Sequence, residues 1–304
     1  MSLTSFVKRE SVRDRFDEKF PNKGNRAEND ICVEWQSNQY RLVGTAFDYL
    51  VRFWLRRHAT DIQSRPWVAE ASLEIAHEEY PGIVEDLTNR IDRAKEARDT
   101  YLESGESTES LLEASLDLAR IDGIYRGGDP PVDLGEYDSN ALSDCRELLE
   151  ILDETNVLTG DEVDLNPAFG VGSALVGGAD ADVILDGTLI DIKTSSKATF
   201  KIDYWRQLVG YLLLADIHAD LNQWQFYEQL GIGEDPNCRA YQDIDSFGVY
   251  FARHGELSTV SSDIVYDHPG YMDVRSWFIE EAIDAYEPMD HAFREELRTI
   301  LLEE

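Results

Sequence analysis

The sequence predicts an α/β protein whose first half is helical, and two patterns support this class. Up to about residue 152, apolar residues recur mainly at helical spacing. After Gly160 they form short runs with period two, separated by turn signals and an intervening helix. A Gly- and Pro-containing stretch at 127–138 lies between the two patterns, so we expect a helical N-terminal region at 1–139 and an α/β core at 140–304.

Each expected element rests on a local signal. The helices of the first part are expected where the apolar spacing is helical, at 41–57, 82–104, 107–124 and 141–152. Pro66 is suited to open a further helix. In the second part a helix is expected at 203–215 with Asp203 as its N-cap, and two helices end the chain. Two hairpins are expected, at the turn dipeptides Asp186-Gly187 and His254-Gly255.

The charge of the chain indicates a high-salt habitat and does not by itself identify a binding partner. The 304 residues carry a formal net charge of −33, with 61 acids spread along the whole chain and only 7 Lys among 28 basic residues. This pattern is typical of proteins from extreme halophiles. At molar salt the Debye length falls to about 3 Å, which weakens repulsion of phosphate. Nucleic acid therefore stays a candidate partner.

Several protein classes are disfavoured. No apolar run approaches the roughly 18 to 20 residues of a membrane span, and the N-terminus lacks a signal-peptide pattern, so we expect a cytoplasmic protein. Cys32, Cys145 and Cys238 form no C-x-x-C pair, so they cannot alone build a zinc or four-Cys iron–sulfur site. No G-x-x-x-x-G-K-[ST] motif is present, so any helicase motor would be a separate partner chain.

The hairpin around Asp186-Gly187 carries the candidate site. A two-residue turn fixes the register, and counting outward places Asp182 opposite Asp191 and Asp180 opposite Lys193. One face then holds the apolar residues Ala181, Val183, Leu185, Ile190 and Ile192. The other face holds Asp180, Asp182, Asp191 and Lys193.

This polar set suits phosphodiester hydrolysis. Opposed residues on one sheet face have Cβ atoms about 4.5 to 5.5 Å apart, so Asp182 and Asp191 can reach one Mg²⁺ ion. Such an ion activates water and polarises the phosphoryl group, and Lys193 can stabilise the developing charge. The alternative is a solvated hairpin in an acid-rich chain, with Asp180 and Lys193 as a surface ion pair.

The residues resemble the PD-(D/E)XK nuclease superfamily, whose signature is an Asp followed across a short hairpin by an acid-x-Lys triplet. Here Asp182 is followed by Asp191-Ile192-Lys193. Gln207 and Tyr211 resemble the Q-x-x-x-Y helix motif of the RecB-like branch, although an ordinary amphipathic helix would also place them on one face. The resemblance implies a restriction-endonuclease-like core, which is a small mixed sheet flanked by helices.

The resemblance also implies roles for these residues. The implied ligands of Mg²⁺ or Mn²⁺ are Asp182, Asp191 and the backbone carbonyl of Ile192, with Asp180 as a rival for the place of Asp182. Lys193 would assist the nucleophilic water. Gln207 and Tyr211 would support the substrate or Lys193.

An additional metal ligand is expected from another helix. RecB-like members often use a histidine within a G-x-x-x-H segment, and here Asp48 stands four residues after Gly44. Asp48 is therefore a candidate ligand, and an exposed i,i+4 ion pair with Arg52 is the alternative. Other members use a Glu from the helix before the hairpin, for which Glu147 and Glu150 are candidates.

These observations predict a metal-dependent deoxyribonuclease that acts in repair, recombination or defence against foreign DNA. Attack from DNA ends and attack within the strand both stay open, as do single- and double-stranded substrates. Two alternatives are a non-catalytic nucleic-acid-binding or scaffolding protein that keeps the nuclease fold, and a nuclease directed at RNA.

Overall fold

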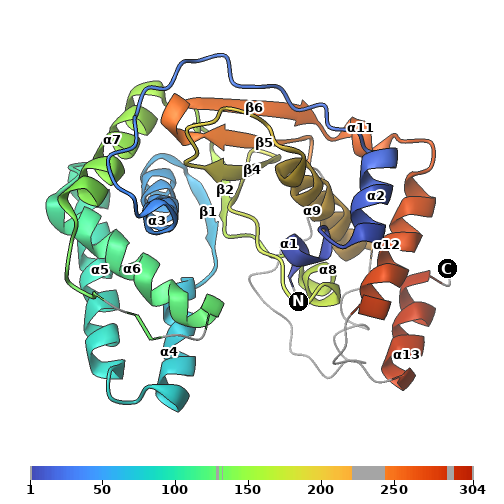
Figure 1. Cartoon of the computed structure of the whole chain (residues 1–304), viewed down its shortest axis with the longest axis horizontal. Helices are drawn as coiled ribbons and strands as arrows, with labels where there is room; N and C mark the ends of the chain where they lie inside the picture. The colour runs from blue at the N-terminus through green and yellow to red at the C-terminus, as the bar shows by residue number, and fades with distance from the viewer. Residues whose placement is uncertain (1, 128–129, 132, 221–243, 286–290, 303–304) are drawn as a thin grey trace.

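The computed structural model describes residues 2–127, 130–131, 133–220, 244–285 and 291–302, and within them a six-stranded mixed sheet lies between two groups of helices (Figure 1). The strands, in spatial order, are β1 Asp61–Ser64, β2 Glu162–Leu165, β3 Val183–Leu185, β4 Thr188–Lys193, β5 Ser246–Phe251 and β6 Glu256–Ser261. The pairs β1–β2 and β4–β5 are parallel, and the other neighbours are antiparallel. The predicted α/β class is confirmed.

Helices from the first half cover one face of the sheet. They are α3 Tyr40–His58, α4 Val68–Glu79, α5 Val84–Ser104, α6 Glu109–Gly127 and α7 Ser139–Thr155. Their apolar sides form one core together with Val183 and Ile190 of the sheet. The four helices predicted from apolar spacing are confirmed to within a few residues at each end. Pro66 lies two residues before the first residue of α4, whose N-cap is Trp67.

The other face is covered by the two ends of the chain, by one short helix before the hairpin and by the helix that follows it. These helices are α1 Leu3–Phe6, α2 Glu10–Lys19, α8 Gly170–Leu175, α9 Ile202–Asp220, α11 Asp263–Tyr266, α12 Tyr271–Ala285 and α13 His291–Leu302. They pack in a second core with Leu189 and Phe247. Residues of the expected N-terminal region 1–139 therefore contribute to both faces, and β1 adds an edge strand to the sheet.

The hairpin β3–β4 has the predicted register. Val183 pairs with Ile190, Ile184 with Leu189 and Leu185 with Thr188. Both turn residues have positive φ, 43° at Asp186 and 74° at Gly187, as a type I′ turn requires. The Asp186 carboxylate also accepts hydrogen bonds from the backbone N–H groups of Asp161 and Glu162, which fixes the turn against β2.

The expected continuation of this pairing to residues 180, 181 and 182 is wrong. Strand pairing ends at Val183, and Asp180 makes an isolated bridge with Ala168 instead. Ala181 therefore packs in the core of the opposite face, with Leu189, and not beside Val183. The cause is that residues before Val183 hydrogen-bond to the segment after β2, where Asn166 N–H donates to the Asp182 carbonyl at 3.0 Å.

The second hairpin is confirmed, and one capping prediction is wrong. Strands β5 and β6 are antiparallel and joined by the short helix η1 Ala252–His254 and Gly255, whose φ is 56°. Helix α9 begins at Ile202, so Asp203 lies in its first turn and is not the N-cap. Its carboxylate instead pairs with Arg206 at 2.8 Å.

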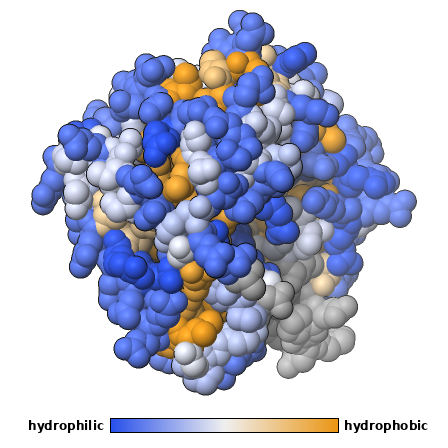
Figure 2. Space-filling view, turned by 60° about the vertical axis from the view of Figure 1, so that its left-hand side comes forward, coloured by the Kyte–Doolittle hydropathy of each residue, from blue (hydrophilic) through white to orange (hydrophobic). Residues whose placement is uncertain are grey.

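The surface agrees with the acid-rich composition. The face in Figure 2 is mostly hydrophilic, with apolar side chains showing in small patches. Among the described residues, none of the helices has the length and apolar content needed to cross a bilayer.

Candidate functional site

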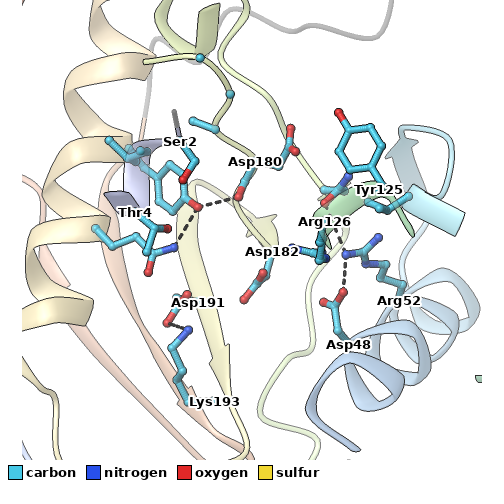
Figure 3. A pocket seen from close by; sticks show the side chains of 18 residues that line it. Ser2, Thr4, Asp48, Arg52, Tyr125, Arg126, Asp180, Asp182, Asp191 and Lys193 are labelled. Atoms are coloured by element: carbon cyan, nitrogen blue, oxygen red, sulfur yellow. Dashed lines mark hydrogen bonds and ion pairs between the residues drawn. The ribbon is translucent and has the colours of Figure 1, made fainter. Parts of the chain in front are cut away.

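A cavity of about 550 Å³ lies at the end of β4, between the two groups of helices, and gathers nearly all the predicted side chains (Figure 3). Its lining includes Asp48, Asp180, Asp182, Asp191, Lys193, Gln207 and Tyr211. The hairpin supplies the central acids and the lysine, while α3 and α9 supply the walls on either side. Ile192, the residue between Asp191 and Lys193, turns its side chain into the core on the other face of the sheet.

Asp182 and Asp191 point into this cavity from adjacent strand ends. Asp191 is 4% exposed, and its Oδ2 lies 2.6 Å from Lys193 Nζ. Asp182 Oδ2 accepts the backbone N–H of Ile192 at 2.7 Å, which holds its carboxylate across the hairpin. The alternative of a solvated hairpin is therefore wrong, because the central acid is buried and Lys193 pairs with Asp191.

The electrostatics of the cavity favour a bound cation. Burial raises the pKa of Asp191 to about 6, although Lys193 opposes the rise, and Asp182 adds to it. Burial lowers the pKa of Lys193, but the carboxylates of Asp191 and Asp182 outweigh this and raise it overall. Lys193 therefore keeps its proton, and ionisation of the buried Asp191 carries a free-energy cost that a bound cation would offset.

Asp48 adds a third carboxylate from α3. It forms the i,i+4 ion pair with Arg52, as one alternative expected, but both side chains are largely buried rather than exposed. Asp48 Oδ1 is buried and has no hydrogen-bond partner among the described residues. Burial raises the pKa of Asp48 to about 6, Arg52 opposes the rise, and Asp182 adds to it. Asp48 and Asp182 are thus close enough to repel.

Gln207 and Tyr211 share one face of α9, as predicted, and their hydrogen bonds reach the hairpin. Gln207 Nε2 donates to the Tyr211 hydroxyl at 3.0 Å, and this hydroxyl donates to the backbone carbonyl of Asp180 at 2.6 Å. Tyr211 is buried, and burial raises its pKa well above the usual value. The pair therefore fixes the backbone that leads into Asp182.

Three predicted candidates do not join the central group. The Asp180 carboxylate points to Arg65, at 3.1 Å, and not to Lys193. Glu147 accepts a hydrogen bond from Gln36, and Glu150 is exposed; neither lines the cavity. Asp180 precedes the first paired residue of β3, so its side chain is not held on the hairpin. Its contact with the Gln207–Tyr211 pair is made by its backbone carbonyl.

The sequence reasoning missed part of the cavity wall. Tyr125 and Arg126, at the end of α6, line it, as do Asn166 and the N-terminal residues 2–4 (Figure 3). Asn166 Oδ1 accepts from Arg52 Nη2 at 3.4 Å and has a φ of 60°. No spacing relates these positions to the hairpin, so only the fold brings them together.

The donors present fit a hard divalent ion. Within the described part of the chain, no group of three or more His, Cys, Asp or Glu side chains is arranged to hold a metal ion. The carboxylates of Asp182, Asp191 and Asp48, whose Oδ1 has no hydrogen-bond partner in the described ranges, nevertheless line one cavity and are oxygen donors of the kind that Mg²⁺ or Mn²⁺ binds. In comparisons with known proteins, no family model, curated protein or solved structure matches the chain.

Proposed function

We propose that this chain is a Mg²⁺- or Mn²⁺-dependent nuclease of the PD-(D/E)XK type, with a restriction-endonuclease-like core, that hydrolyses DNA phosphodiester bonds. The observation that carries the proposal is one cavity in which Asp182, Asp191 and Lys193 meet, backed by the Gln207–Tyr211 pair. Repair, recombination or defence against foreign DNA in the cytoplasm is the setting that we propose for this activity.

Each side chain then has a defined task. Asp182, Asp191 and the backbone carbonyl of Ile192 would hold the ion, and Asp48 lies in the same wall as a further oxygen donor. When bound, the ion would supply Lewis acidity toward the phosphoryl group and toward water. Because Lys193 keeps its proton, it donates hydrogen bonds to a phosphate oxygen or to the attacking water and stabilises negative charge. Tyr211 keeps the Asp180 backbone, and with it Asp182, in place.

Cleavage assays with Lys193→Ala test the proposal. Labelled linear and circular DNA are incubated at high KCl with Mn²⁺ or with EDTA. Cleavage should require Mn²⁺ and fall by about 10²- to 10³-fold in Lys193→Ala, the usual loss for one charge-stabilising donor. Lys95→Ala is the matched control, because Lys95 pairs with Glu70 at 2.8 Å and neither residue lines the cavity. Wild-type rates in Lys193→Ala would contradict the role of Lys193, and cutting of the circle shows internal attack.

One observation favours a second candidate. The lack of a three-ligand group in the described residues fits a non-catalytic nucleic-acid-binding or scaffolding protein that keeps this fold. Calorimetry with Mn²⁺ separates the two: the nuclease binds the ion and loses this binding in Asp191→Ala, whereas the scaffold binds none. Labelled RNA of the same sequence, in parallel assays, tests an RNA-directed nuclease.

A further inference from the structure

A second cavity, of about 370 Å³, adjoins the candidate metal site, and Lys193 lies in the wall of both. Two segments form its lining: the stretch that enters α3, and the end of β4 with the loop after it. The lining residues are Trp35, Tyr40, Arg41, Gly44, Ile192, Lys193, Thr194, Ser195 and Ser196. Nothing in the proposed chemistry uses Trp35, Tyr40 or Arg41.

A buried arginine holds the two walls of this cavity together. Arg253 is fully buried and donates from Nε to the Thr194 carbonyl at 2.9 Å. Its Nη1 donates to the carbonyls of Val33 and Glu34, at 3.2 and 3.0 Å, and to Asp144 Oδ1 at 3.0 Å. Arg253 therefore holds the segment before α3 and the loop after β4 in a fixed position relative to one another.

The same arginine fixes an aromatic pair. The Arg253 guanidinium lies 3.3 Å from the centroid of the Trp35 ring. The Tyr40 ring meets Trp35 edge to face, with centroids 4.6 Å apart, and the Tyr40 residue is 55% exposed. Tyr40 is thus an exposed ring on a rigid support, which lowers the entropy lost when a flat ligand stacks on it.

The charged side chains that line the second cavity are both cations, Arg41 and Lys193, although the chain carries −33 overall. Arg41 and Lys197 are exposed, and neither has an acidic partner among the described residues. Arg52 and Arg206, by contrast, are each paired with an Asp. An exposed ring beside Arg41 and the Ser195 and Ser196 residues of the same cavity fits a nucleobase together with its phosphate.

We propose that this second cavity is a subsite for single-stranded DNA, in which a base stacks on Tyr40 and a neighbouring phosphate contacts Arg41. Inside a duplex both faces of each base are covered by neighbouring bases, so away from duplex ends only an unpaired strand offers a base face to Tyr40. The inference rests on the proposed function for the identity of the polymer, and it deepens that function by naming a single strand beside the candidate catalytic lysine.

Binding without metal tests the subsite separately from cleavage. Fluorescence anisotropy of a dye-labelled single strand, in EDTA and at one fixed KCl concentration, is measured for wild type, Tyr40→Ala, Tyr40→Phe and Arg41→Ala. Tyr40→Ala should weaken binding about 5- to 100-fold, as expected for one stacked base, and Tyr40→Phe should bind like wild type. Arg41→Ala should weaken binding and reduce its salt dependence by about one phosphate contact.

Two controls make the result decisive. Arg93→Ala removes an exposed charge from α5 and should leave binding unchanged. A duplex of the same sequence should bind more weakly than the single strand and should not respond to Tyr40→Ala. The subsite is refuted if Tyr40→Ala, folded by circular dichroism, binds as wild type does, or if Arg93→Ala loses as much as Arg41→Ala. Tyr40-dependent binding without any cleavage would refute the nuclease function and leave the subsite standing.

Discussion

The buried carboxylate of Asp191 predicts a pH-dependent stability that Asp191→Asn removes. Burial raises its pKa from 3.8 to about 6 even though Lys193 opposes the change. A carboxyl group with a raised pKa binds its proton more tightly in the folded state, so the metal-free protein loses stability as the pH rises through this interval. One pKa unit corresponds to about 1.4 kcal/mol, so the loss reaches about 3 kcal/mol near neutral pH.

Urea unfolding of wild type and Asp191→Asn, in EDTA and one high-KCl buffer, measures this pH-dependent contribution of Asp191 to the free energy of unfolding. Asn has the shape of Asp and does not ionise, and the contributions of acids that do not interact with Asp191 cancel in the difference. The unfolding free energy of the variant minus that of wild type should increase by about 3 kcal/mol between about pH 4 and pH 7 and then level off. The attraction between Lys193 and the ionised Asp191 is already contained in the Asp191 pKa of about 6, so it adds no separate pH-dependent contribution.

Manganese supplies the second arm of the same experiment. Wild type should gain stability with Mn²⁺ in proportion to the logarithm of its concentration, because the ion binds only the folded protein. Asp191→Asn should gain little. A difference that stays flat across the pH interval, or equal gains from Mn²⁺ in both proteins, would refute the reasoning.

Three further predictions concern residues around the site. Tyr211→Phe removes the 2.6 Å hydrogen bond to the Asp180 carbonyl and should lower the free energy of unfolding in urea by about 0.5 to 1.5 kcal/mol. Asp48→Asn removes one charge beside Asp182 and should weaken Mn²⁺ binding about 10- to 100-fold by calorimetry, and an unchanged affinity would exclude Asp48 from the site. Arg253→Met leaves Asp144 buried without a counter-charge and should cost about 3 to 5 kcal/mol in urea unfolding, whereas Arg93→Met should stay within about 0.5 kcal/mol of wild type.

The sequence predicted the parts of the site that depend on neighbours in the chain. A type I′ turn at Asp186-Gly187 sets the hairpin register by itself, so the opposition of the residues next to it followed from counting. The spacing of Gln207 and Tyr211 placed both on one face of α9 for the same reason. The hairpin register and the shared helix face both depend only on residues close together in the chain, so they can be predicted from the sequence.

The parts that failed depend on distant contacts. Residue Asp180 leaves the ladder because Ala168 and Arg65, which are far away in the chain, bind it. Asp48 looks like an exposed helix residue in the sequence, yet the packing of α3 against the sheet buries it with Arg52. The contacts of Arg253 with Val33, Glu34 and Asp144 likewise have no sequence signal.

Net charge and local charge act over different distances in this protein. The acid excess predicts a setting of molar salt, where counterion release from phosphate contributes little to binding and a Lys or Arg contact loses much of its strength. Direct ligation of a metal ion and stacking on an aromatic ring act at contact distance and are screened much less. A nuclease under these conditions should therefore rely on buried carboxylates such as Asp191 and on fixed rings such as Tyr40. Its affinity for a single strand should therefore contain a large salt-independent part from stacking, and its salt dependence should reflect only the few phosphates that cations such as Arg41 neutralise.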